Sequence, residues 1–323
     1  MPELPDIVVY AEAIERHAGG RRLERIRLAS PFVLRSVEPP LSAFDGRDLR
    51  RVRRLGKRLV LDFGEAHFIV VHLMIAGRLR WRARGAKVPG RVGLASFDFE
   101  SGSVILTEAG TKKRASVRAV RGEDALAALD PGGIDVFTST PTEFADAIGR
   151  ESHTLKRTLT DPRLLSGIGN AYSDEILHRA RLSPLRLTRH LQADEIERLR
   201  AAACTVLAEW TSRLRDEVGE GFPEKVTAFR AEMAVHGRFG QPCPVCGSPV
   251  QRISYAENEC NYCATCQTGG RLLADRAMSR LLRDDWPRSL DEWESHVAER
   301  RVEPAAGVPT SGPAPGPRGT KER

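Results

Sequence analysis

The chain has 323 residues, enough for two domains, and carries a formal net charge of +7 with an isoelectric point of about 9.3. This basic balance favours a polyanionic partner, whereas an aromatic content of only 6% argues against a base-stacking surface for single strands. No apolar run approaches the ~20 residues of a membrane span, and the acidic N-terminus does not match a signal peptide. We therefore expect a cytoplasmic, nucleoid-associated protein without a membrane partner.

The chain begins Met1-Pro2-Glu3, which would expose a secondary amine beside a carboxylic acid if Met1 were removed. A free α-amine titrates near pH ~7.7–8.0, so part of it is uncharged and nucleophilic at neutral pH. A secondary amine that attacks an aldehyde-like carbon gives an iminium ion directly, and Glu3 is near enough to serve as an acid. The same residues also suit an ordinary helix start, because proline and acids favour the first helical turn.

Residues 4–18 predict a helix, because apolar side chains recur at helical spacing until two glycines follow. Residues 22–121 predict repeated short strands, with apolar stretches at 59–61, 68–71 and 103–106 that glycine, proline and charged turns separate. Such repeated strands are typical of a sandwich or a barrel-like pair of sheets.

Positive charge is concentrated in two segments of this β-rich region. Seven Lys or Arg and one acid lie between Arg47 and Arg58, and a second group includes Lys112, Lys113, Arg114, Arg118 and Arg121. One such run is usually a solvated face. Two runs, in a chain that also carries a zinc-knuckle pattern, indicate nucleic acid as the partner.

Residues 122–230 predict helices, including a long one over 194–218 with an apolar residue at every third or fourth position. Within this region the two glycines of Ser166-Gly-Ile-Gly-Asn170 would let the backbone approach a ligand, and a helix starts near Asn170. The N–H groups at that start suit a phosphate, and Lys156 could add a positive charge to the same pocket. An ordinary loop between packed helices would have the same pattern.

Near the C-terminus, Cys243 and Cys246 form one CxxC pair and Cys263 and Cys266 form a second, with sixteen residues between the pairs. This spacing is typical of a four-cysteine zinc site, in which each pair gives two thiolates to one tetrahedral ion. Cys260 could replace Cys266 in the second pair, but we favour Cys263 and Cys266. Disulfides are disfavoured because nothing else indicates secretion. Four cysteines leave no position for an activated water, so we expect one structural zinc ion.

The chain therefore divides into five predicted parts. They are an N-terminal β-rich domain (1–121), a helical domain (122–230), a zinc-finger hairpin (231–275), a helical extension (276–302) and a disordered tail (303–323).

In order along the chain, these segments resemble the formamidopyrimidine-DNA glycosylase and endonuclease VIII family of base-excision repair enzymes. The resemblance runs from Met1 to about Gln267 and rests on MPELPD, RRLGKRLVL, HLMIAGRLR, HTLKRTLTDPRLLSGIGNAYSDEIL and VHGRFGQPCPVC. It implies an α+β fold with a β-sandwich that carries the N-terminal helix, a helix-two-turn-helix domain and a C-terminal zinc-finger hairpin. DNA would lie in the basic cleft between the two domains, and we expect a monomer.

The resemblance also implies roles for individual residues. Pro2 would be the Schiff-base nucleophile, and Glu3 the general acid that protonates the deoxyribose ring oxygen. Lys57 would contact phosphate and assist near the lesion, while Lys156 and Asn170 would hold the phosphates beside the extruded nucleotide. The implied activity is that of a bifunctional DNA glycosylase and AP lyase on oxidised or ring-opened bases, with β- or β,δ-elimination. The partner would be double-stranded DNA with damaged bases or abasic sites.

The sequence departs from the family pattern at several DNA-contacting positions. Asn258 stands where the finger usually carries an arginine, and Asn can bind phosphate but cannot neutralise it. Met74 or Ile75 must fill the gap left by the extruded base. Lys113 or Arg114 must replace residues that probe the opposite base, in a loop without an aromatic side chain.

Two more departures concern the lesion itself. Asp6 stands where glutamate is commoner, and the loop that starts at Gly219 differs from the one that caps 8-oxoguanine. All these changes leave a second hypothesis open, a protein that binds damaged or abasic DNA with weak or no excision. A zinc-ribbon nucleic-acid module is a third hypothesis, and it would leave Pro2 without a role.

Overall fold

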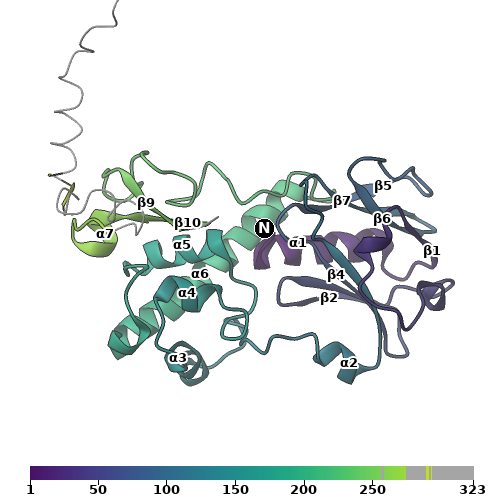
Figure 1. Ribbon diagram of the computed structural model, residues 1–323, viewed down its shortest axis with the longest axis horizontal. Coiled ribbons are helices and arrows are strands. Elements are labelled where there is room, and N and C mark those ends of the chain that lie inside the picture. Colours follow the sequence, from purple (N-terminus) through teal and green to yellow (C-terminus); the bar gives the residue numbers. More distant parts are fainter. Residues whose placement is uncertain (256–257, 274–288, 291, 293–323) are drawn as a thin grey trace, which may run out of the picture.

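The computed structural model of the chain describes residues 1–255, 258–273, 289–290 and 292. Figure 1 shows the N-terminus at the centre of the molecule, between a strand-rich half and a helical half. The predicted extension 276–302 and tail 303–323 lie outside the described residues, apart from three isolated positions. Among the described residues, no helix combines the length and apolar character needed to cross a membrane.

Helix α1 spans Leu4–Ala18, which confirms the helix predicted there. Its start is stabilised by Asp6, whose carboxylate accepts the Glu3 backbone N–H at 2.9 Å. Its end lies at Gly19, where a Cβ atom would come within 2.3 Å of the Glu15 carbonyl oxygen. The first turn of the chain is therefore held in one conformation, and Pro2 and Glu3 precede it directly.

Between residues 23 and 121 the chain forms a sandwich of two antiparallel sheets, as predicted. The strands are β1 (Leu23–Leu28), β2 (Arg51–Leu55), β3 (Arg58–Asp62), β4 (His67–His72), β5 (Gly77–Arg82), β6 (Gly93–Phe99), β7 (Gly102–Glu108) and β8 (Ser116–Arg121). One sheet has the order β1-β6-β7-β5 and the other β2-β3-β4-β8. The first core lies between their inner faces and α1, and it includes Phe97, Leu59 and Ile69, each at most 1% exposed.

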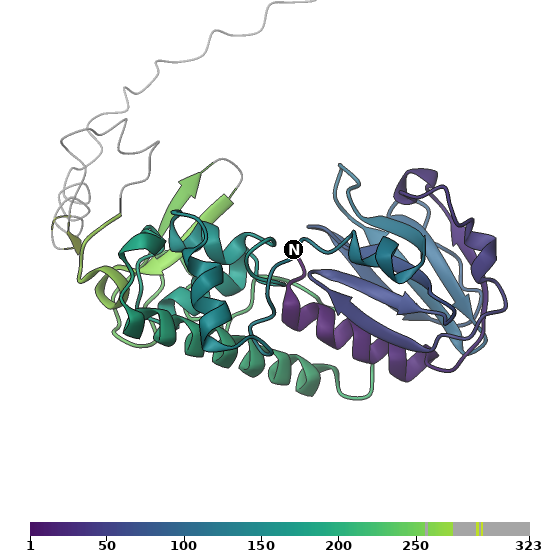
Figure 2. The ribbon, with the colours of Figure 1, turned by 90° about the horizontal axis from the view of Figure 1, so that it is seen from below.

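The helical half follows the sandwich. Its helices are α2 (Glu123–Ala127), α3 (Pro141–Gly149), α4 (Leu155–Thr160), α5 (Asn170–Arg179) and α6 (Ala193–Val218). Helix α6 confirms the long helix predicted over 194–218. A second core forms between α3, α4, α5 and α6, and Leu4 of α1 packs into it, whereas Ile7 and Tyr10 of α1 pack into the first core. Helix α1 therefore joins both halves, and Figure 2 shows α6 leading toward it.

A small hairpin lies beyond α6, as predicted, and the cysteine pairs surround it: Cys243 and Cys246 precede its first strand, Cys263 ends its second strand, and Cys266 lies in the helix that follows. Strand β9 (Val250–Tyr255) pairs with β10 (Asn258–Cys263), and the short helix α7 (Ala264–Thr268) follows. The hairpin packs against α5 (Figure 1). The α+β class, the sandwich, the helical half and the cysteine hairpin are therefore as expected, while the domain boundaries stay a prediction.

Candidate active site and metal centre

The carboxylate of Glu3 lies on the N-terminal end of α5. It accepts the backbone N–H groups of Gly169 at 2.7 Å, Ala171 at 2.9 Å and Tyr172 at 3.2 Å, and the Glu3 residue is only 2% exposed. In this structure the N–H groups for which the sequence predicts a phosphate donate to Glu3, and a contact with phosphate stays a prediction. A helix start attracts an anion, and here the protein supplies its own.

Two glycines allow this close approach. A Cβ atom on Gly169 would lie 2.6 Å from Glu3 Oε1 and 2.9 Å from Lys57 Nζ, so the carboxylate and the ammonium converge on one point. Gly167 has φ of 85°, and its carbonyl accepts the Leu4 N–H at 2.9 Å. The glycines predicted to admit a ligand therefore admit the N-terminal segment and Lys57.

The α-amino group lies in the same place. Met1 precedes the buried Pro2 in this structure, and removal of Met1 would transfer the α-amine to Pro2. Burial lowers the pKa of the Met1 amine, although the negative charge of Glu3 acts in the opposite direction. Burial likewise lowers the pKa of Lys57. A lowered pKa raises the fraction of neutral, nucleophilic amine. The structure thus brings together the three residues to which the sequence assigned the chemistry.

A cavity of about 310 Å³ lies between α1, the end of α6 and the segment 221–226. It is lined by Asp6, Val9, Leu214, Glu217, Val218, Gly221, Phe222, Pro223, Glu224, Lys225, Val226 and Arg230. Asp6 is 4% exposed, and its Oδ1 atom has no hydrogen-bond partner among the described residues. The Arg230 Nε atom is likewise without a partner in that part of the chain. The cavity therefore has a mixed lining, in which acidic and basic side chains lie beside apolar ones.

Asp6 makes the stability of the fold depend on pH. Burial raises the pKa of Asp6 to about 6, because the buried site disfavours the ionised carboxylate. The folded protein therefore loses stability as the pH rises from the ordinary pKa of an aspartate, ~3.9, to about 6. An Asn side chain cannot ionise, and its oxygen can still accept the Glu3 N–H. We expect Asp6→Asn to gain on the order of 2 kcal/mol over the wild type above pH ~6, and to gain nothing from this source below pH ~4.

Chemical denaturation at a series of pH values measures this difference. Asp146→Asn, which changes an exposed acid on α3, is the matched control and should show no such trend. A stability difference between Asp6→Asn and wild type that stays constant from pH 4 to 7 would contradict the assignment.

Lys156 and Asn170 lie on α4 and α5 beside the catalytic group. The Lys156 ammonium donates to the Asn170 carbonyl at 2.6 Å, the Ser173 hydroxyl at 2.8 Å and the Asp174 carboxylate at 2.6 Å. The Asn170 side chain donates to the Glu259 carbonyl of β10 at 2.9 Å. These contacts tie α4, α5 and the hairpin together, and the phosphate contacts predicted for Lys156 and Asn170 stay predictions.

The other predicted DNA contacts come from loops and from the hairpin. Met74 and Ile75 form the turn between β4 and β5, where Met74 has φ of 53° and Ile75 is 55% exposed. Lys113 and Arg114 lie exposed in the loop between β7 and β8. Asn258 is the first residue of β10. Their roles toward DNA stay predictions.

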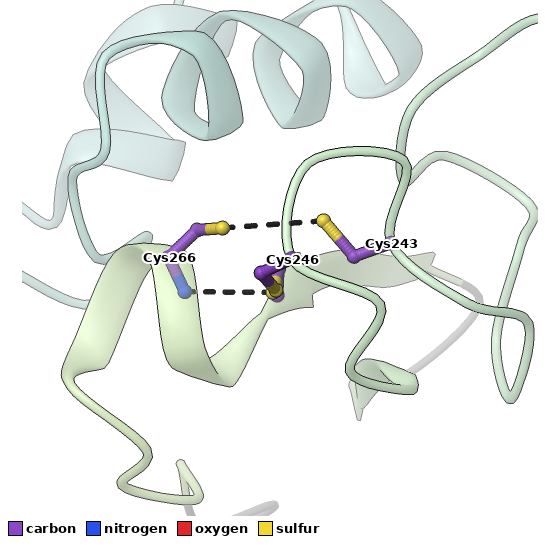
Figure 3. Close-up of side chains that lie close together, drawn as sticks. Cys243, Cys246 and Cys266 are labelled. Carbon is purple, nitrogen blue, oxygen red and sulfur yellow. Dashed lines mark hydrogen bonds between the residues drawn. The ribbon is translucent and has the colours of Figure 1, made fainter.

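The four predicted metal ligands form one cluster. The sulfur atoms of Cys243, Cys246, Cys263 and Cys266 all lie within 4.8 Å of one another. Figure 3 shows Cys243 and Cys266 facing each other; their sulfur atoms are 4.0 Å apart, and the sulfurs of Cys246 and Cys263 are 3.3 Å apart. A tetrahedral zinc ion with Zn–S bonds of about 2.3 Å needs sulfurs roughly 3.8 Å apart, so the cluster fits a metal. Cys260 is buried outside it, which favours Cys263 and Cys266 as the second pair.

The thiols of this cluster differ in their readiness to ionise. Burial opposes ionisation of Cys246, but hydrogen bonds from Ser248 outweigh it and lower the pKa of that thiol. Burial raises the pKa of Cys266 to about 11 and raises that of Cys263 further. Metal binding must therefore displace protons from the buried thiols, starting from a thiolate at Cys246.

Sequence reasoning missed the contacts that join the two halves beside Glu3. Arg54 of β2 donates to the Ser166 hydroxyl at 3.0 Å and forms an ion pair with Asp135. The only signal in the sequence was an arginine within a basic run, and such runs usually face solvent. Contacts across about a hundred residues leave no local pattern.

The sandwich, the helical half and the cysteine hairpin, arranged around a buried N-terminal acid, define a DNA glycosylase with a helix-two-turn-helix domain. Two family descriptions match the chain, the formamidopyrimidine-DNA glycosylase N-terminal domain over residues 1–115 and the formamidopyrimidine-DNA glycosylase H2TH domain over residues 133–215. The chain belongs to the formamidopyrimidine-DNA glycosylase family.

Individual relatives agree with this assignment. A formamidopyrimidine-DNA glycosylase from Desulfitobacterium hafniense is 30% identical over 83% of this chain and 100% of the relative. An uncharacterized formamidopyrimidine-DNA glycosylase-like protein from Mycobacterium tuberculosis is 42% identical over 48% of this chain and 95% of the relative. The crystal structure of the MutM (Fpg) protein from Thermus thermophilus aligns with a TM-score of 0.69 and 29% identity, over 82% of this chain and 98% of the other.

Proposed function

We propose that this protein is a bifunctional DNA glycosylase and AP lyase that excises oxidised or ring-opened bases from duplex DNA. The observation that carries the proposal is the convergence of the Glu3 carboxylate, the Lys57 ammonium and the N-terminal amine where the two halves meet. Family membership supports the glycosylase activity, and the net charge of +7 supports a DNA partner.

In the proposed reaction, the Pro2 amine attacks C1′ of the damaged nucleotide while the bond from C1′ to the base breaks. The amine then loses its proton, Glu3 donates a proton to the deoxyribose ring oxygen, and the C1′–O4′ bond breaks as the nitrogen lone pair forms the C1′=N bond, while Lys57 assists beside the lesion. The resulting iminium acidifies the C2′ proton, and loss of that proton expels the 3′ phosphate by β-elimination. A second elimination would remove the 5′ phosphate.

The target base must leave the stack before the amine can reach C1′, at a cost of roughly a few kcal/mol. The cavity beside Asp6 would receive the base, because Asp6 on its wall also accepts the backbone N–H of Glu3. Met74 or Ile75 would fill the gap in the duplex, and Lys113 or Arg114 would approach the opposite strand. Lys156, Asn170 and Asn258 would support the phosphate backbone.

The cysteine cluster would hold one structural Zn²⁺. Thiolates are soft ligands that zinc accepts in tetrahedral sites, and four of them leave no place for a water. The ion would stabilise the hairpin that carries Asn258 and would take no part in bond breaking.

Base release and strand cleavage on a panel of duplexes test this function. The panel contains 8-oxoguanine, ring-opened guanine, an oxidised pyrimidine and an abasic site. We expect release of at least one oxidised base and cleavage at the abasic site, with both reduced about 10²–10⁴-fold in Glu3→Gln.

The second candidate, a protein that binds lesions without excising them, is favoured by Asn258 in place of a cationic residue. Tight binding to an abasic-site analogue, with no release from any duplex of the panel, would establish it and exclude the enzyme.

A further inference from the structure

His178 joins the cysteine cluster to α5. It lies near the C-terminal end of that helix, and its Nε2 atom is 3.3 Å from Cys243 Sγ. His178 is 6% exposed and Cys243 is 2% exposed, so water has little access to either partner. When Cys243 is a thiolate, the sulfur can only accept, and the imidazole N–H is the donor.

A four-thiolate site has a physical need for such donors. Four thiolates around one divalent cation leave two excess negative charges, and N–H···S hydrogen bonds spread that charge over the protein. The backbone N–H groups of Val245 and Cys266 supply two weak bonds, each at 3.5 Å, to Cys243 and Cys263. Those donors belong to the hairpin itself, whereas His178 comes from the helical half.

Helix α5 also contacts the strand β10 of the hairpin and the segment 234–236 that precedes the hairpin. The buried Asp174 carboxylate accepts from His236 Nδ1 at 2.8 Å and from the Asn261 N–H at 3.1 Å. The Glu175 carboxylate accepts the N–H groups of 234–236 at 2.8 to 2.9 Å. His178 follows them one turn later. The helix is about 15 Å long, so Glu3 at one end and Cys243 at the other are joined by one rigid element.

We propose that His178 is a positioning residue of the metal centre: it donates a hydrogen bond to the Cys243 thiolate and fixes the metal-bearing hairpin on α5. This inference rests on the proposed metal site. Under this proposal, α5 fixes the position of the hairpin relative to the catalytic group, which lies at the opposite end of the helix.

The first test measures Zn²⁺ affinity of the full chain by competition with a chromophoric chelator. His178→Phe keeps the ring volume and removes the donor, and we expect its apparent dissociation constant to rise 10–100-fold. His178→Gln retains an N–H donor and should recover most of the affinity. His190→Phe, at an exposed position before α6, is the matched control and should behave as wild type.

The second test uses Co²⁺ in place of Zn²⁺ and reads the thiolate-to-cobalt charge-transfer band. Loss of an N–H···S bond makes the sulfur a better electron donor, so the band should move to longer wavelength in His178→Phe and not in His190→Phe. A purely structural loss would not move the band. If His178→Phe does not fold, His178→Gln decides, because a wild-type band and affinity in it support the donor role.

Equal affinity and an unchanged band in folded His178→Phe would overturn the inference while the metal site stands. A wild-type chain that binds neither ion through four sulfurs would overturn the metal site and this inference together. In both cases base release by the wild type remains a separate measurement, so the failure of the enzymatic proposal is recognised independently.

Discussion

Acetylation of the N-terminus should abolish covalent trapping of this protein on abasic DNA by borohydride. Borohydride reduces an iminium to a stable amine, so the adduct reports the bond between the enzyme nitrogen and C1′. Pro2→Gly should lower the trapping rate about 10²-fold or more, because it replaces the secondary amine by a primary one and loosens the first turn. Gel separation of the adduct, with mass spectrometry of the N-terminus, makes both measurements.

Lys57 is the competing nucleophile. Its ammonium converges with the Glu3 carboxylate, and burial lowers its pKa, so it has the properties expected of a reactive amine. Trapping that survives N-terminal acetylation and disappears in Lys57→Met would transfer the role from Pro2 to Lys57. Under our proposal, Lys57→Met still traps and does so more slowly, since the N-terminal amine remains.

Lys156→Met should destabilise the folded protein by about 3–5 kcal/mol. The ammonium and the Asp174 carboxylate lie 2.6 Å apart, and both residues are at most 4% exposed. Removal of the lysine leaves a buried carboxylate with fewer partners, which costs more than the lost attraction. Asp174→Asn in the same chain removes that charge and should restore much of the stability. Denaturant unfolding of the two single variants and the double variant measures the coupling.

Arg22→Met is the matched control, because Arg22 forms an exposed ion pair with Glu100 and should contribute less than about 1 kcal/mol. The competing role for Lys156 is contact with phosphate. If Lys156→Met keeps wild-type stability and loses DNA affinity with a reduced salt dependence, the lysine serves the DNA and not the fold.

Local patterns in the sequence determined much of this protein. Apolar spacing predicted α1 and α6, short apolar stretches predicted β3, β4 and β7, and the spacing of two CxxC pairs predicted the sulfur cluster. These predictions succeed because helical periodicity, strand length and a metal knuckle each depend on residues close in sequence. The first three residues likewise predict an amine beside a carboxylic acid.

Only the tertiary structure decided what those groups touch. The start of α5 attracts an anion, but nothing local shows that its N–H groups donate to Glu3, 166 residues earlier. In the same way nothing near Lys156 in the sequence shows that Asp174 is its partner, and nothing near His178 shows that Cys243 lies within hydrogen-bond distance. An unsatisfied donor or charge specifies the kind of partner it needs. Which partner it receives depends on long-range packing, because burial removes water as the alternative.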